Sequence, residues 1–283
     1  MAARSYDALV LDVDGTLLGD DERVHPRTQQ ALMRAHAAGV VVMLATGRAH
    51  RTTRGLMREL GLVAPALVYN GAALYCPAED RLIERRVLAD ELVEELHALT
   101  APRDLLTVVE HGDERYARAA RNPHEASLLT WLGCVQRPLE PLSGGQTVRF
   151  TIFSEQHHDS LALHDEVRNA ASQPAYYTHF GLAMLAGFRD SHVQGLDVHP
   201  VCEGKAEVFR VLQARFGIPN GRVVAVGDAD NDLPMLSGAG LGVAMGNATD
   251  AAKRAARRVI GDNCGDALAT LIEELFLEAA AAD

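Results

Sequence analysis

Short apolar runs alternate with amphipathic segments near both ends of this chain, and this alternation restricts the possible folds more than any other feature. The runs at 7–13 (DALVLDV), 40–48 (VVVMLATGR) and 65–71 (PALVYNG) are rich in Val and Leu, as strands buried on two faces are. Helical periodicity separates them at 26–39 and 49–61, where Pro and Gly occupy plausible ends. The pattern predicts a doubly wound parallel sheet, an α/β fold.

This rhythm stops after residues 70–71 and resumes in the last third of the chain. Between these parts we expect hairpins, helices and short strands in α+β order, including a strand pair at 175–180 and 182–187. The simplest arrangement is one α/β domain, residues 1–83 and 192–283, interrupted by an inserted α+β domain of residues 84–191.

Composition narrows the class of function. The 283 residues carry a formal charge of −11, so Lys and Arg are too few for nucleic acid to be the expected partner. The four cysteines are far apart and form no metal-binding pair, which favours reduced thiols. The first 15 residues match neither a signal peptide nor a membrane span. We therefore expect a cytoplasmic protein that does not associate with membranes. We expect it to be a monomer or a homodimer.

Two acids lie at the end of the first apolar run. Asp12 and Asp14 are two positions apart, and side chains at that spacing share one face of a strand. In open parallel sheets, ligands bind beyond the carboxyl ends of the strands. Taken alone, the DxDG sequence also fits an ordinary surface turn.

Three further segments place polar groups at the same predicted edge. Thr46 and Gly47 lie at the end of the second run, Lys205 begins a predicted helix, and Asp228 and Asp232 follow the run VVAVG. Each has an ordinary explanation on its own, as a helix cap or a solvated lysine. Together they supply the hydroxyl, backbone N–H, ammonium and carboxylate groups that phosphate and Mg²⁺ require.

These residues carry a family resemblance. The segments LDVDGTLL, LATGR, NGA, GKAEVFRVLQARFGI and VVAVGDADNDLPMLSGAGLGVAMGNA occur in the order and spacing of the haloacid dehalogenase (HAD) superfamily. The chain resembles its Cof-type branch, in which a large cap lies between the second and third motifs. The resemblance covers most of the two core segments and implies a Rossmann-like HAD core with an inserted cap. The insert itself offers no specific motif.

The resemblance also implies a mechanism. Asp12 would attack the phosphoryl group and form an aspartyl-phosphate, and Asp14 would protonate the leaving alcohol and then activate water. Mg²⁺ would be held by Asp12, the backbone carbonyl of Asp14, Asp228, and Asp232 either directly or through water. Dehalogenases of this superfamily lack the second acid, so Asp14 favours phosphatase chemistry.

The phosphoryl oxygens would be held by Thr46, the Gly47 N–H, Lys205 and Asn231. The Asn70-Gly71 pair is a tight-turn signal that borders the active site in the family, so Asn70 is a candidate substrate contact. Arg48 is another, or it braces the acidic loop. In the insert, four polar side chains could recognise the substrate, and their sequence context favours none of them: Arg118, Arg149, Tyr177 and His179. Trp131 is expected in the core.

The predicted function is Mg²⁺-dependent hydrolysis of a small phosphorylated metabolite, with sugar phosphates as the leading class. A phosphomutase would use the same aspartyl-phosphate, and a non-catalytic phosphometabolite sensor would keep the scaffold, so both alternatives stay open. The run GAGLGVAMG resembles a dinucleotide loop but does not follow the first strand, which disfavours a nucleotide cofactor.

Overall fold

A computed structural model describes residues 4–138, 144–184 and 186–277. The chain divides into two compact units, the first formed by Met1–Glu84 with Glu203–Asp283 and the second by Arg85–Cys202. The boundary expected between 83 and 84 differs by one residue. The boundary expected between 191 and 192 lies before strand β11 (Gln194–His199), which pairs with two strands of the second unit.

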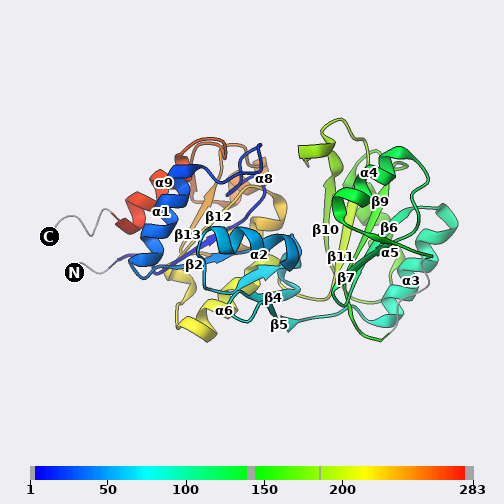
Figure 1. The fold of residues 1–283 in the computed structure, drawn as a ribbon, viewed down its shortest axis with the longest axis horizontal. Helices are drawn as coiled ribbons and strands as arrows, with labels where there is room; N and C mark the ends of the chain where they lie inside the picture. Colours follow the sequence, from blue (N-terminus) through cyan, green and yellow to red (C-terminus); the bar gives the residue numbers. More distant parts are fainter. Residues whose placement is uncertain (1–3, 139–143, 185, 278–283) are drawn as a thin grey trace. The chain divides into compact units, whose positions relative to one another are not determined.

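The first unit is built on a five-stranded sheet in the order β14-β13-β12-β1-β2, all parallel. The strands are β1 (Ala8–Leu11), β2 (Val41–Leu44), β12 (Val223–Gly227), β13 (Leu241–Ala244) and β14 (Arg258–Val259). Every residue of β1 and β12 is buried, because helices cover both faces (Figure 1). The predicted doubly wound α/β core is confirmed.

Six α-helices and one π-helix in the described part of the first unit flank its strands. They are α1 (Pro26–Ala37), α2 (His50–Glu59), α6 (Glu207–Phe216), α7 (Leu233–Gly238), α8 (Asp250–Ala255), α9 (Ala267–Ile272) and the five-residue π turn Glu273–Leu277. Pro26 occupies the first position of α1, where its missing N–H costs nothing, and His25 accepts a hydrogen bond from the N–H of Arg27. Figure 1 shows α1 beside α9.

A smaller sheet, β3-β4-β5, extends the first unit beyond β2. Its strands are β3 (Ala66–Val68), β4 (Ala73–Cys76) and β5 (Arg81–Arg85), the last of which crosses into the second unit. The N–H of Thr46 donates to the carbonyl of Leu67, so the chain after β2 continues alongside β3. The turn that follows β3 is thereby placed next to the loop that follows β2.

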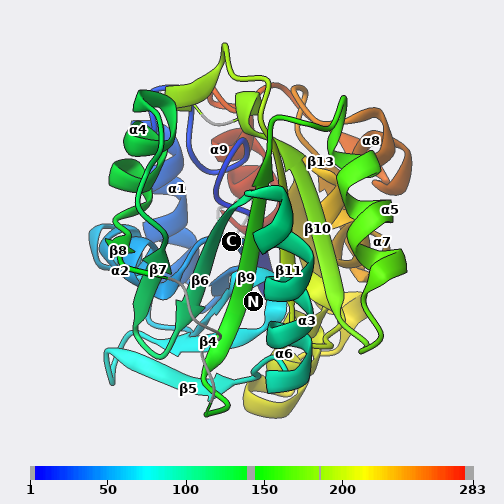
Figure 2. The same cartoon turned by 90° about the vertical axis from the view of Figure 1, so that its right-hand side faces the viewer.

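The second unit contains a six-stranded sheet in the order β10-β11-β9-β6-β7-β8, antiparallel except between β7 and β8. Its other strands are β6 (Leu106–His111), β7 (Glu114–Ala117), β8 (Val135–Gln136), β9 (Thr147–Ser154) and β10 (Tyr176–Gly181). Its helices are α3 (Asp90–Thr100), α4 (Pro123–Leu132) and α5 (Ser160–Ala170). Figure 2 shows α3 and α5 on one face of this sheet, where an apolar cluster joins them to it.

One predicted strand of the second unit is wrong. Residues 182–187 were expected to pair with 175–180, but Leu182–Met184 and Ala186–Phe188 are single 3₁₀ turns. The partner of β10 is β11, whose six residues pair with it along its whole length. The N–H of Leu182 bonds the carbonyl of Val193 and closes that ladder, so the intervening chain is a connection between the two strands.

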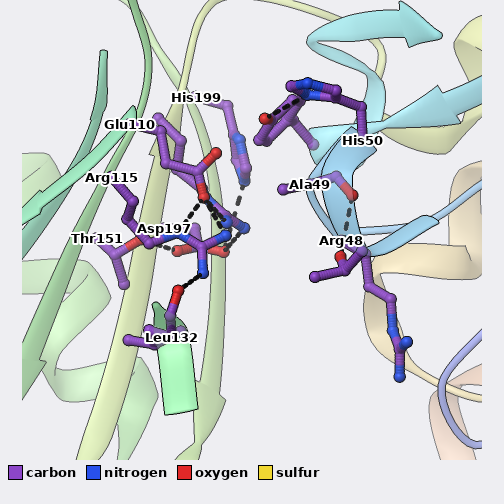
Figure 3. Close-up of polar contacts among 12 residues, drawn as sticks. Arg48, Ala49, His50, Glu110, Arg115, Leu132, Thr151, Asp197 and His199 are labelled. Carbon is purple, nitrogen blue, oxygen red and sulfur yellow. Dashed lines mark hydrogen bonds and ion pairs between the residues drawn. The ribbon is translucent and has the colours of Figure 1, made fainter. Parts of the chain in front are cut away.

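The strand face opposite α3 and α5 carries a buried ion-pair network (Figure 3). Arg149 contacts Glu110 at 2.5 Å and Asp197 at 3.2 Å, and Arg115 contacts Glu110 at 2.6 Å. Burial raises the pKa of Glu110, but the Arg149 and Arg115 guanidinium charges outweigh it and lower the pKa to about 2. The network therefore requires an ionised Glu110.

His199 lies beside this network and gives a pH-dependent stability. Complete burial lowers its pKa from 6.5 to about 4, although the Asp197 carboxylate 3.9 Å away acts in the opposite direction. Below pH 6.5 the His199 imidazole binds a proton in the unfolded chain, whereas in the folded chain it stays neutral down to about pH 4. The free energy of unfolding should therefore fall across this window by on the order of 3 kcal/mol.

Denaturant titrations at several pH values between 7 and 4 check this expectation. The matched variant, His199→Gln, removes the titrating group and should flatten the pH dependence over that window, whatever its stability at pH 7. Equal slopes for the two proteins would show that His199 does not carry the effect.

Candidate active site

Three strand ends meet at one edge of the parallel sheet in the first unit. Leu11 is in register with Leu44 on β2 and with Val226 on β12. Because the strands are parallel, the residues that follow them leave the sheet at the same edge. The loops that carry Asp12, Thr46 and Asp228 therefore begin side by side.

Lys205 stands at the centre of this edge, only 1% exposed. Its Nζ lies 2.6 Å from Asp12 Oδ1 and 2.5 Å from Asp232 Oδ1. Burial alone lowers the pKa of Lys205, but the charges of the two carboxylates outweigh it and raise the pKa above its usual value. The predicted phosphate-binding lysine is thus a permanent cation between two acids.

Burial and the neighbouring Asp232 charge raise the pKa of Asp12 well above its ordinary value, although Lys205 opposes the shift. A carboxylate in this position is costly to ionise without a further cation. Three carboxylates crowd the site, because oxygens of Asp12, Asp228 and Asp232 lie within 4.8 Å of one another. Hard carboxylate oxygens at this spacing could hold a divalent metal ion.

The second carboxylate oxygen of Asp232 holds the neighbouring backbone in place. Asp232 Oδ2 accepts hydrogen bonds from the backbone N–H groups of Asp228 and Ala229, both at 2.9 Å. Gly227 makes this possible, because a Cβ there would lie 2.5 Å from the Asp232 carboxyl carbon. Asp232 therefore fixes the loop that carries Asp228, besides lying within reach of a metal.

Asp228 is held from the other side by the loop after β1. Thr16 Oγ1 donates to Asp228 Oδ1 at 2.8 Å. Burial and the Asp232 charge raise the pKa of Asp228 to about 6, although the Thr16 hydrogen bond acts against this. Gly15 has a φ of +76°, and a Cβ at this position would approach Asp228 Oδ2 to 2.3 Å. Gly15 is needed for both reasons.

Asp14 does not join the carboxylate cluster. Its side chain is 54% exposed and forms a bidentate pair with Arg48, with Nε 2.9 Å from Oδ2 and Nη2 2.5 Å from Oδ1. Strand β1 ends at Leu11, so strand alternation does not fix the directions of Asp12 and Asp14. The two acids have separate partners and separate surroundings.

The loop after β2 lies against the turn after β3. Thr46 is buried, and its Oγ1 accepts a hydrogen bond from the Arg48 N–H at 3.0 Å, which leaves its own O–H to donate. Asn231 Nδ2 donates to Asn70 Oδ1 at 3.0 Å, and the Asn70 amide lies 3.1 Å from the space a Cβ on Gly47 would fill. The structure thus brings Thr46 and Gly47, from the loop after β2, next to Asn70 and Asn231.

Two residues with a structural part in this site were missed by sequence reasoning. Thr16 donates to Asp228, and Asn247 Nδ2 donates to the Gly15 carbonyl at 2.8 Å. Both lie inside the motif segments DGT and GNA, but only their three-dimensional partners indicate what they do.

Comparison with known proteins identifies the family of this chain. The family model for haloacid dehalogenase-like hydrolases matches residues 9–272. The chain is 31% identical to the pyridoxal phosphate phosphatase of Escherichia coli, over 93% of this chain and 96% of that protein. It is 26% identical to a 5-amino-6-(5-phospho-D-ribitylamino)uracil phosphatase of Bacillus subtilis, over 95% and 97% of the two chains.

The solved structures agree. A haloacid dehalogenase-like hydrolase from Bacteroides thetaiotaomicron superposes with a TM-score of 0.75 at 25% identity, covering 96% of this chain and all of that one. Of the helices in the described part of the chain, none has both the length and the apolar character needed to cross a bilayer. This chain belongs to the haloacid dehalogenase-like hydrolases, in their Cof-type branch with an inserted sheet, and it is a phosphatase of small phosphorylated metabolites.

Proposed function

We propose that this phosphatase hydrolyses its substrate through an aspartyl-phosphate on Asp12, with Mg²⁺ as cofactor. The observation that carries the proposal is the buried Asp12 carboxylate, held by Lys205 and crowded by Asp228 and Asp232. A fold gains nothing from this concentration of buried acids unless cations neutralise it. A nucleophile beside a phosphoryl dianion needs such cations.

The reaction has two steps. In the first, an oxygen of Asp12 forms a bond to phosphorus, the bond from phosphorus to the substrate oxygen breaks, and Asp14 gives that oxygen a proton. In the second, Asp14 takes a proton from water, the water oxygen bonds phosphorus, and the aspartyl oxygen leaves. Arg48 is proposed to orient Asp14 between these steps and to contact the substrate.

Thr46, the Gly47 N–H, Lys205 and Asn231 are proposed to hold the phosphoryl oxygens. Thr46 has a free O–H to donate, and Lys205 carries its charge into the same buried edge. Hydrogen bonds from charged and neutral donors to an anion strengthen as charge develops on the transferring group. Asn70 is a candidate substrate contact.

The residues present fit a divalent metal. Asp12, Asp228 and Asp232 would hold Mg²⁺, together with the backbone carbonyl of Asp14. Burial and the neighbouring Asp232 charge raise the pKa of Asp12 and Asp228 although Lys205 opposes the shift, so a further cation would favour their ionised forms. When bound, Mg²⁺ would neutralise the acids and act as a Lewis acid on the phosphoryl oxygens.

Sugar phosphates are the leading substrate class that we propose. The relatives whose names specify ribitylaminouracil phosphate and pyridoxal phosphate support a compact polar leaving group. The first unit is proposed as the catalytic domain and the second as a cap that selects the substrate. We further propose that the protein is a cytoplasmic monomer or homodimer and that it does not bind nucleic acid.

A phosphate-release screen tests this function, using sugar phosphates, phosphoglycolate, nucleotides, pyridoxal phosphate and p-nitrophenyl phosphate with Mg²⁺ present. Turnover should release inorganic phosphate. Conversion of a sugar phosphate to its isomer without phosphate release would instead identify a phosphomutase. Absence of turnover on the whole panel, with ligands still raising the melting temperature, would identify a sensor.

Metal removal should abolish turnover. With EDTA, the phosphate-release rate should fall by at least about 100-fold, because Lys205 alone cannot offset three carboxylates and a phosphate dianion. Adding excess Mg²⁺ should restore the rate, and the melting temperature should rise with Mg²⁺ concentration. An unchanged rate in EDTA would rule out the metal's role.

A further inference from the structure

The turn after β3 has an unusual backbone. Tyr69, Asn70 and Gly71 have φ values of 53°, 51° and 99°, three consecutive residues in the left-handed region. Glycine adopts this region freely and Asn tolerates it, but for an aromatic residue it is an outlier. Tyr69 and Asn70 are both buried. A strained, buried turn persists only where surrounding contacts determine it, and such turns are typical of functional sites.

The contacts of this turn reach three loops of the candidate site. The N–H of Tyr69 donates to the Arg48 carbonyl, and the N–H of Asn70 donates to the Thr46 carbonyl, both at 3.0 Å. A Cβ on Gly71 would lie 2.3 Å from the carbonyl oxygen of Gly204, the residue before Lys205. The turn is thus packed directly against the loops that carry Thr46 and Lys205.

The third loop is reached by the Asn70 side chain. Asn70 Oδ1 accepts a hydrogen bond from Asn231 Nδ2, which fixes one of the two hydrogens on that nitrogen and leaves the other to donate. Asn231 Oδ1 is buried and has no hydrogen-bond partner among the described residues. This oxygen can only accept, as phosphoryl oxygens do, so it is the remaining Nδ2 hydrogen of Asn231 that would donate to them.

We propose that Asn70 is a positioning residue, which sets the orientation of the Asn231 amide and the shape of the Thr46–Gly47 loop for the phosphoryl group. This rests on the proposed function, because it assumes that Asn231 receives phosphoryl oxygens. In this proposal Asn70 holds the Asn231 amide in place, in addition to any contact that it makes with the substrate. The left-handed turn places the Asn70 amide between Gly47 and Asn231.

The informative variant is Asn70→Gly. Glycine accepts the left-handed backbone without strain, so the turn can keep its conformation while the amide that orients Asn231 is lost. The value of kcat/KM for p-nitrophenyl phosphate should drop about 10- to 100-fold, as expected for a weakened hydrogen bond to a charged group. The inhibition constant of inorganic phosphate should rise in parallel.

A double-mutant cycle with Asn231→Ala separates positioning from independent roles. If Asn70 acts through Asn231, Asn70→Gly should reduce kcat/KM little further in the Asn231→Ala background. Tyr69→Phe is the matched control within the turn, since it removes only the hydroxyl that lies 3.0 Å from His50 Nδ1, and should leave kcat/KM unchanged.

Two results would overturn the proposal. One is a lower melting temperature of Asn70→Gly with unchanged kcat/KM, which a merely structural turn would give. The other is an equal loss of kcat/KM in both backgrounds of the cycle. If the wild-type enzyme itself releases no phosphate from any substrate, it is the proposed function that fails, and the two failures are thereby distinguished.

Discussion

Replacing Asp12 by Asn should reduce phosphate release from p-nitrophenyl phosphate by on the order of 1,000-fold or more. An amide oxygen is a poor nucleophile, and the variant also removes one of the two carboxylates that hold Lys205. The measurement is the steady-state rate with excess Mg²⁺. The matched control is Asp165→Asn on α5, an exposed acid of the second unit, which should keep the wild-type rate.

A denaturant titration of the metal-free variant separates loss of folding from loss of chemistry. Lys205 keeps its contact with Asp232 at 2.5 Å in this variant, so one carboxylate still accompanies the buried cation. Because a proposed metal ligand is lost, stabilisation by Mg²⁺ should shrink. Retained hydrolysis by a folded Asp12→Asn protein would refute the nucleophile assignment.

Replacing Lys205 by Met should affect both stability and activity. Two buried carboxylates, Asp12 and Asp232, would lose the cation that lies 2.6 and 2.5 Å from them. Removing one partner of a buried ion pair costs about 3–5 kcal/mol of unfolding free energy. The phosphoryl group would lose a charged donor as well, so the phosphate-release rate should fall at least about 100-fold.

Denaturant titration and steady-state kinetics measure the two effects. Lys253→Met on α8 is the matched control, and it should change neither by much because Lys253 lies outside the site. The double variant Lys205→Met with Asp12→Asn should be less destabilised than Lys205→Met alone, because one uncompensated charge is gone. Wild-type stability of Lys205→Met would show that the buried triad does not need its cation.

The sequence was most informative where the site lies at strand ends. Buried Val- and Leu-rich runs followed directly by Asp12, Thr46 and Asp228 were enough to predict both the parallel sheet and the edge where these residues meet. Position along the chain could not show that Asp14 pairs with Arg48, since β1 ends before either acid. It also could not show that Asp232 uses its second oxygen to hold the Asp228 loop.

The second unit was harder to predict, because its contacts join residues far apart in the chain. Glu110 and Arg149 stand within apolar runs, but only the pairing of β6 with β9 makes them partners. Trp131 was expected in the core and is 49% exposed. Helix α4 buries Leu128 and Leu129 instead, and the Trp131 ring packs edge-on against Phe188 at 5.7 Å.

Direct detection of the phosphorylated aspartate tests the central claim most directly. The wild-type enzyme is mixed with p-nitrophenyl phosphate and Mg²⁺, quenched in acid and treated with borohydride, which reduces an acyl phosphate to an alcohol. Peptide mass spectrometry should then find homoserine at position 12 in the wild type and not in Asp12→Asn. Rapid phosphate release with an unmodified Asp12 under the same conditions would contradict the proposed intermediate.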